Sequence, residues 1–324
     1  MAMTTEFGDS PAIDPQLHTR RLRRQDRFFF WLAWGSATVV VLVLLGVLLS
    51  LLSEALPALR QFGLPFLWTE RWSPAKDIYG AAAPIFGTLV TSAIAMLIGV
   101  PASFGIAIFL TELCPKVLRR PIGIAIELLA GIPSIIYGLW GFFVFAPWMA
   151  AHVEPFLTAT FGELPIIGVL FQGAPYGIGM LTAGIVLAIM ILPFITSVTR
   201  DVFETVPVML RESAYGLGMT TWEVVRHVII PYTRLGLVGG VMLGLGRALG
   251  ETMAVTFVIG NSHRIHASLL APGTTISAAI ANEFTEATTT LYSSSLVALG
   301  LILFVITFIV LGLAKWLTGR SESF

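Results

Sequence analysis

Residues 84–110 read PIFGTLVTSAIAMLIGVPASFGIAIFL, a run without a charged side chain. A helix needs about 20 consecutive apolar residues to cross the hydrocarbon core of a bilayer, so this run is long enough to do so. The run therefore predicts a membrane-spanning helix.

The composition extends the membrane assignment to the whole chain. Apolar residues make up 56% of the 324 residues and charged residues only 12%, whereas a soluble domain carries about 25% charged residues. The formal net charge is zero, so there is no basic footprint of the kind that marks nucleic-acid binding. So few charges could not cover a surface that faces water.

Five further runs meet the length criterion for a spanning helix, and together they predict an all-α membrane protein with six transmembrane helices. Pro101 and Pro133 fall inside the second and third spans and predict kinks there, because proline lacks a backbone donor and clashes with the preceding turn. The six expected spans are 28–53, 84–110, 122–148, 178–197, 235–259 and 296–317.

The distribution of Lys and Arg predicts the orientation. Basic residues gather in the N-terminal tail, in the loop after the second span, in the loop over about 200–234 and at the C-terminal end. Because such residues are enriched on the cytoplasmic side, both termini are expected there. The expected organisation is a cytoplasmic tail (1–27), a first helix (28–53), an extracytoplasmic loop (54–83), a five-helix core (84–317) and a second cytoplasmic tail (318–324).

Two loops on the outer side are long enough to have a role of their own. Residues 54–83 and 149–177 are rich in Pro, Gly and aromatic residues. They either fold against the outer mouth and dock a partner, or they are ordered connectors.

The loop over 200–234 predicts two short helices separated by a glycine turn. Pro207 suits the first turn of a helix, and the run Gly216–Gly218 suits its end. Thr220 and Glu223 form a capping-box pattern at the start of the second helix, which Pro231 is expected to end. Such short helices are unstable alone.

Four apolar side chains of this loop are expected to be exposed. They are Val208, Leu210, Val224 and Val225. The loop therefore needs a surface to pack on, which a cytoplasmic partner would supply.

The fifth expected span carries two charges, Arg247 and Glu251. A charge at mid-bilayer is costly unless it faces protein or water, and a spacing of four places both side chains on one face of a continuous helix. Two interpretations stay open. Arg247 lies in a pathway and offers its donors to an oxyanion while Glu251 returns it to a paired state, or the two form a buried structural bridge.

Glycines recur every four residues in the same span. Small residues at this spacing let helix backbones approach closely in a membrane, so these positions predict helix packing rather than a nucleotide-binding loop. The positions are Gly236, Gly240, Gly244, Gly246 and Gly250.

A resemblance to a known family rests on the loop spacing. Glu212-Ser213-Ala214, three residues, Gly218, nine residues and then Val228 to Pro231 resemble the Glu-Ala-Ala loop of ABC importer permeases. The resemblance implies a type-I importer permease core over 84–317. It also implies that this loop, with Glu212, Ser213, Ala214, Gly218 and Pro231, couples to an ATPase. A loop that only covers lipid headgroups is the alternative.

The string from Gly244 to Val255 resembles the permeases of phosphate importers, as does the string from Ala130 to Gly141. This resemblance implies inorganic phosphate as cargo and a bacterial cytoplasmic membrane as location. The implied partners are a second related permease, two copies of an ABC ATPase and an extracytoplasmic phosphate-binding protein. The core from Arg247 to Glu251 is shared with sulfate and molybdate permeases, so these oxyanions stay open as alternatives.

No cofactor and no metal are expected on this chain. The sequence lacks a GxxxxGK[ST] motif, so ATP would be used by the partner ATPase. His263 and His266 are three residues apart in an expected loop, which does not favour a metal site. An intramembrane enzyme would need a nucleophile with a base, and a secondary transporter would work without an ATPase; both remain alternatives to an importer subunit.

Overall fold

The structure is a computed structural model that describes residues 15–165 and 167–319. Of the expected tails, residues 1–14 and 320–324 lie outside the described residues, whereas 15–27 begin helix α1 (Pro15–Phe62). The chain divides into two compact units, Met1–Ser53 and Glu54–Phe324, which are described separately.

The first unit is the long part of α1. This helix runs without interruption past Ser53 to Phe62, so the first part of the loop expected over 54–83 is helical. Its apolar stretch, within Asp26–Phe62, is long enough to cross a membrane.

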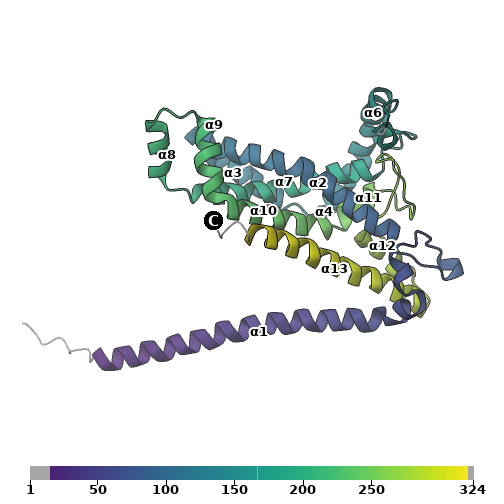
Figure 1. Cartoon of the computed structure of the whole chain (residues 1–324), viewed down its shortest axis with the longest axis horizontal. Helices are drawn as coiled ribbons and strands as arrows, with labels where there is room; N and C mark the ends of the chain where they lie inside the picture. Colours follow the sequence, from purple (N-terminus) through teal and green to yellow (C-terminus); the bar gives the residue numbers. More distant parts are fainter. Residues whose placement is uncertain (1–14, 166, 320–324) are drawn as a thin grey trace, which may run out of the picture. The chain divides into compact units, whose positions relative to one another are not determined.

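The second unit is a helical bundle built around α2 (Ala82–Ile108) and α7 (Met180–Glu204), which pack side by side (Figure 1). Within the described residues of the whole chain, six helices are long and apolar enough to span a membrane, as the sequence predicts. The other two long helices of this unit are α10 (Ile230–Leu249) and α13 (Thr290–Gly319). The remaining helical elements are η1 (Leu64–Leu67), η2 (Pro74–Lys76), η3 (Phe109–Leu113), α3 (Lys116–Ala130), α4 (Ser134–Trp140), η4 (Gly141–Phe145), α5 (Ala146–Trp148), η5 (Met149–Val153), α6 (Glu154–Phe161), η6 (Gly168–Phe171), α8 (Val208–Gly216), α9 (Thr221–Val224), η7 (Val225–Ile229), α11 (Met253–Val258), α12 (Ile276–Glu283) and η8 (Phe284–Glu286).

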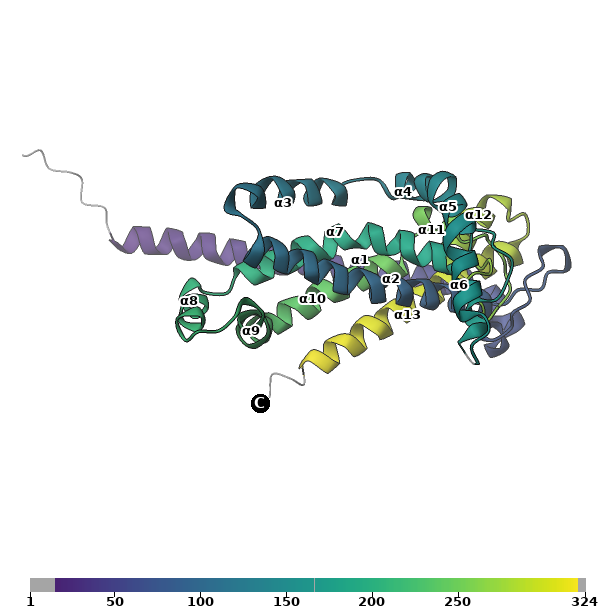
Figure 2. The same cartoon turned by 90° about the horizontal axis from the view of Figure 1, so that it is seen from above.

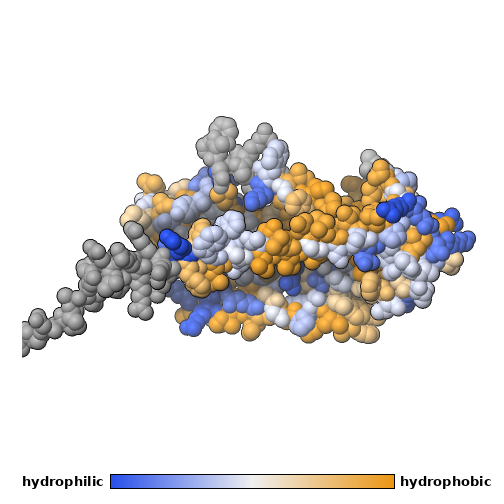
Figure 3. All heavy atoms as spheres, turned by 90° about the horizontal axis from the view of Figure 1, so that it is seen from below, coloured by the Kyte–Doolittle hydropathy of each residue, from blue (hydrophilic) through white to orange (hydrophobic). Residues whose placement is uncertain are grey.

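The bundle of the second unit has two distinct ends. Helices α8 and α9 lie at one end, termed the α8 end, and α6 and α12 lie at the other, the α12 end (Figures 1 and 2). Hydrophobic residues cover much of the surface drawn in Figure 3, in which both units are shown. Exposed apolar surface of this extent suits a chain whose helices face lipid.

The third expected span, 122–148, is wrong in its bounds. Helix α3 ends at Ala130, and a second helical run covers Ser134–Phe161. Pro133 interrupts the helix rather than kinking it, because the residue before a proline is disfavoured in the α conformation. In Figure 2 the two pieces follow one another along one side of the bundle. Pro101, in contrast, lies inside α2, which continues to Ile108.

The fifth expected span, 235–259, is also wrong in its bounds. The helical run starts at Thr221, continues through Pro231 and ends at Leu249. Pro231 does not end the second loop helix: the helix runs through it, directly after the π-helical turn η7, where the regular hydrogen-bond pattern that a proline would break is already altered. Residues 250–252 then break the helix before α11 begins.

Gly87 lies where α2 touches the backbone of the loop before α12. A Cβ built on Gly87 would come within 1.9 Å of the carbonyl oxygen of Thr274. Ile276 also donates its backbone N–H to the hydroxyl of Thr88, at 2.9 Å. This contact holds the α12 end to the central helix pair.

Replacing Gly87 with Ala is therefore expected to lower the free energy of unfolding by about 1–3 kcal/mol, the usual cost of overpacking. Gly105→Ala in the same helix is the matched control, because a Cβ on Gly105 would have no neighbouring atom within 4 Å. The melting temperatures of the two purified variants would measure the difference. Equal melting temperatures would contradict the tight contact at Gly87.

Candidate functional site

The loop between α7 and α10 has the predicted helix–turn–helix form. Helix α8 ends at Gly216, and Gly218 takes φ +84°, a left-handed conformation that favours glycine. The capping box is present: Glu223 donates its backbone N–H to the Thr220 hydroxyl at 3.4 Å, and its carboxylate accepts from the Thr220 N–H at 2.7 Å. The turn and the start of α9 are therefore fixed by local sequence.

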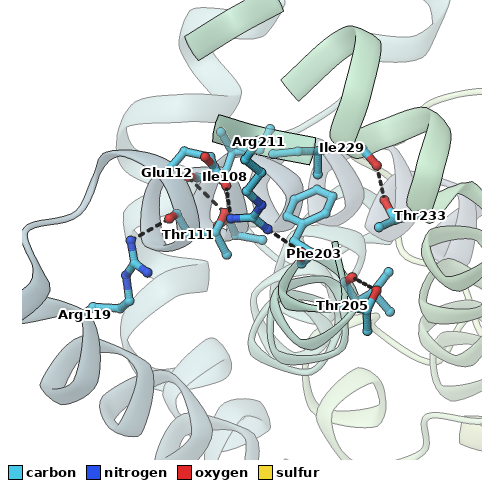
Figure 4. Close-up of polar contacts among 11 residues, drawn as sticks. Ile108, Thr111, Glu112, Arg119, Phe203, Thr205, Arg211, Ile229 and Thr233 are labelled. Carbon is cyan, nitrogen blue, oxygen red and sulfur yellow. Dashed lines mark hydrogen bonds and ion pairs between the residues drawn. The ribbon is translucent and has the colours of Figure 1, made fainter. Parts of the chain in front are cut away.

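An ion pair anchors α8 to the rest of the bundle (Figure 4). Arg211 donates from Nη1 to Glu112 Oε1 at 2.8 Å and from Nη2 to the carbonyl oxygen of Phe203. It thus joins α8 to η3 at the end of α2 and to the last turn of α7. The Glu112 side chain is only 5% exposed, so this pair sits where an unpaired charge would be costly.

The pair of Arg211 and Glu112 is not predicted by the sequence. Arg211 and Glu112 are 99 residues apart, and nothing local marks them as partners. The one signal is that Glu112 lies two residues beyond the apolar run 84–110, where a carboxylate needs a counter-charge.

Two of the four valines and leucines expected to be exposed are in fact buried. Val224 and Val225 pack with Phe203, Ile229 and other residues into a core beneath the loop, because α9 starts the long helix of α10 and one face of it covers the bundle. Val208 and Leu210 are exposed as expected.

The exposed apolar surface of the loop lies on α8 and the glycine turn. Met209 is 76% and Leu217 84% exposed. Glu212 and Ser213 are exposed beside them, whereas Ala214 is buried against the core below. A helix with one anchored face and one bare apolar face is suited to bind a partner.

The charges in the fifth span are not paired as the sequence suggests. Arg247 lies in the last turn of α10, while Glu251 lies in the break after it, so they do not share one helical face. Among the described residues the structure forms no ion pair between them. Glu251 instead accepts the backbone N–H of Ala254 at 3.3 Å, at the start of α11.

Arg247 is exposed near the C-terminal end of α10. Its guanidinium carbon lies 5.9 Å from the centre of the Phe194 ring. Its donors are thus available to an anion. Helices α4 and α11 pack closely together, since a Cβ on Gly138 would meet the Met253 carbonyl oxygen at 2.9 Å.

The predicted glycine positions fall into two groups. A Cβ on Gly236, Gly240 or Gly244 would come within 3.0 Å of side chains on α7, so these three let α10 approach α7 as their spacing predicts. Gly246 makes only an ordinary contact with α13, and Gly250 lies beyond the end of α10. The last two therefore have no comparable packing role in this fold.

A carboxylate at the α12 end ties four segments together, and sequence reasoning did not find it. Glu283 accepts from Trp72 Nε1, from Tyr292 Oη and from His263 Nε2, each at 2.6 Å. The Trp72 and His263 rings stack, with centroids 4.9 Å apart. This group of four residues, termed the Glu283 cluster, holds the segments that carry Trp72 and His263 against α12 and α13.

The Glu283 cluster predicts a pH dependence. Burial alone would raise the pKa of Glu283, but hydrogen bonds from His263, Tyr292 and Trp72 outweigh it, so the pKa lies below its ordinary value. A lowered carboxyl pKa adds stability above the unfolded pKa, about 4.3, and this stability is lost as pH falls through the folded pKa. The difference in melting temperature between the unsubstituted chain and Glu283→Gln should therefore shrink below about pH 4.3. A difference that stays constant down to the lowest pH would contradict this explanation.

Comparisons with known proteins bear on these sites. A family model described as "Binding-protein-dependent transport system inner membrane component" matches residues 99–322. The phosphate transport system permease protein PstC of Mesorhizobium japonicum is 61% identical over 304 residues, which cover 94% of this chain and 93% of that protein. The probable phosphate transport system permease protein PstC of Methanocaldococcus jannaschii is 41% identical over 85% of this chain and 88% of its own length.

A solved structure shares the fold. A chain of the bacterial alginate ABC transporter, in complex with an alginate pentasaccharide-bound periplasmic protein, matches with a TM-score of 0.62. The match covers 92% of this chain and 98% of that chain at 17% sequence identity. This likeness concerns the arrangement of helices alone.

Proposed function

Because the chain belongs to the family of binding-protein-dependent transport system inner membrane components, we propose that it is the permease subunit of an ATP-driven importer of inorganic phosphate. The observation that carries this proposal is the match of phosphate transport system permease proteins along nearly the whole chain. The type-I importer permease core expected from the loop spacing is confirmed by the shared fold.

The α8 loop is proposed as the contact with the ATPase. Its bare apolar surface, with Met209 and Leu217, needs a partner, and its other face is fixed to α2 and α7 through Arg211. A partner that moves α8 would therefore move the ends of both central helices. Glu212 and Ser213, exposed on α8, would meet the ATPase, and Gly218 would shape the turn between the two helices.

The remaining partners and the orientation follow from the same proposal. The α8 end faces the cytoplasm, where the basic loops gather, and both termini lie there. A second, related permease completes the pathway, two ATPase copies bind at the α8 end, and a phosphate-binding protein docks at the α12 end. ATP is bound by the ATPase and no cofactor is held by this chain.

Arg247 is proposed as an oxyanion contact on the pathway. Its guanidinium is exposed and has no carboxylate partner among the described residues, and its planar fork of donors matches a phosphate. Glu251 supports the start of α11 rather than returning Arg247 to a paired state. The proposal therefore gives Arg247 the contact with the anion without the alternation between anion and Glu251 that the sequence suggests.

Uptake of labelled phosphate tests the function. The chain, its neighbouring permease, the ATPase and the binding protein would be expressed together in cells that lack high-affinity phosphate uptake. We expect uptake at micromolar phosphate that requires an active ATPase and is not reduced by excess sulfate or molybdate. Competition by sulfate or molybdate would reassign the cargo, and uptake with an inactive ATPase would overturn the importer assignment.

A further inference from the structure

A basic pocket of about 290 Å³ opens at the α8 end, between α3 and the last turns of α7. Four cationic side chains and two carboxylates line it, and Asp201 pairs with Arg200 beside it, so a small excess of positive charge remains, which comes from α3. The lining residues are Lys116, Arg119, Arg120, Ile124, Glu127, Arg200 and Glu204.

Arg200 is positioned in this pocket by contacts on both sides. Its Nη2 lies 2.7 Å from Glu127 Oε1 and 2.9 Å from Asp201 Oδ1. A Cβ on Gly123 would come within 2.8 Å of Arg200 Nη1, so the absence of a side chain on α3 leaves room for the guanidinium. The two helices thus build the pocket wall jointly.

The cations from α3 form no ion pair within the described residues. Lys116 and Arg120 are exposed and form no ion pair with the other described residues. Arg119 donates from Nη2 to the carbonyl oxygen of Thr111, and its buried Nε has no partner in the described structure (Figure 4). The exposed donors of Lys116 and Arg120 are therefore left for an anion.

An exposed apolar surface adjoins these cations on the same helix. Val117 is 84% and Leu128 70% exposed, and Leu118 is also exposed. Helix α3 therefore combines a basic N-terminal turn with apolar side chains, which is the pattern of a helix that contacts the headgroups and acyl chains of a membrane.

We infer that this pocket binds the phosphate group of an anionic phospholipid. The guanidinium groups match the geometry of a phosphate oxyanion, and the excess positive charge selects an anionic over a zwitterionic headgroup. Inorganic phosphate offers the same group but has no chain to cover Val117 and Leu128, which favours the lipid. The site is separate from Arg247, which lies at the opposite end of α10 from the α8 loop.

Lipid retention by the assembled importer tests this inference. The complex would be reconstituted in nanodiscs of phosphatidylcholine with a minor share of phosphatidylglycerol, and the lipids retained after extraction would be counted by native mass spectrometry. Lys116→Gln with Arg120→Gln is expected to lower phosphatidylglycerol retention about tenfold. Arg71→Gln with Lys76→Gln, which removes equal charge from exposed residues at the α12 end, is the matched control and should retain the lipid.

A second variant leaves the charge unchanged. Gly123→Ala places a methyl group against Arg200 Nη1 and is expected to weaken retention without altering assembly. Equal retention in the pocket variants and the control would overturn the inference.

A further experiment distinguishes a lipid phosphate group from free inorganic phosphate. Labelled inorganic phosphate would be added to complexes in pure phosphatidylcholine. Binding that is lost in the Lys116 and Arg120 variant, together with displacement of phosphatidylglycerol by millimolar phosphate, would overturn the lipid assignment in favour of the free ion. Retention of phosphatidylglycerol in the presence of phosphate supports the lipid.

Discussion

Replacing Arg211 with Ala is expected to lower the free energy of unfolding by about 3–5 kcal/mol, the usual cost of leaving a buried charge unpaired. Glu112 is 5% exposed and loses the cationic partner that it has among the described residues, and the carbonyl oxygen of Phe203 loses a donor. Helix α8 would then be released from the ends of α2 and α7. Phosphate uptake should fall more steeply than ATPase binding, because the exposed surface of α8 is unchanged while its anchor is lost.

A double substitution separates the charge effect from the loss of side-chain packing. Arg211→Ala combined with Glu112→Gln removes both charges, so it should be more stable than Arg211→Ala alone. Arg226→Ala serves as control, because Arg226 is exposed and forms no ion pair in the described structure. Melting temperatures and ATPase pull-down would be measured on each variant. If Arg211→Ala melts like the control, the pair is not the anchor.

Replacing Arg247 with Ala is expected to reduce phosphate uptake by about 10–100-fold while leaving assembly intact. A hydrogen bond to a charged group contributes about 1.5–3 kcal/mol, which corresponds to a loss of that size. Assembly should persist because the side chain is exposed and its contact with the Phe194 ring, at 5.9 Å, is a weak one. Arg247→Lys keeps the charge without the planar fork and should give intermediate uptake.

Glu251→Gln is the informative companion to Arg247→Ala. The Gln amide oxygen can still accept the Ala254 N–H, so this variant should keep most of the uptake. If Glu251→Gln were as damaging as Arg247→Ala, and the double variant restored uptake, the two residues would act as a functional pair and Arg247 would not work alone. Unchanged uptake in Arg247→Ala would remove Arg247 from the pathway.

The predicted features that the structure contains are each determined by a short stretch of sequence. The number of spans follows from the length of apolar runs, because lipid demands about 20 apolar residues in succession. The glycine turn at Gly218 and the capping box of Thr220 and Glu223 are local in the same way. The approach of α10 to α7 follows from three small residues at a fixed spacing.

The bounds of the third and fifth spans could not be predicted from local sequence. Pro133 and Pro231 look alike as proline signals, yet the helix is interrupted before Pro133 and runs through Pro231. The residues before both prolines are helical, but only those before Pro231 form a π-helical turn, η7. The break at 250–252, which separates Arg247 from Glu251, likewise has no clear local marker among the glycines around it.

The sequence by itself determined a six-span helical protein and the helix–glycine turn–helix form of the loop between α7 and α10. Only the tertiary structure decided which charges meet. Arg211 pairs with Glu112, which is 99 residues away in the sequence, and Glu283 accepts hydrogen bonds from Trp72, His263 and Tyr292. The physical reason is that the apolar length of a segment alone decides whether it can span lipid. The partner of a buried charge depends instead on which side chains the packing brings within hydrogen-bond distance.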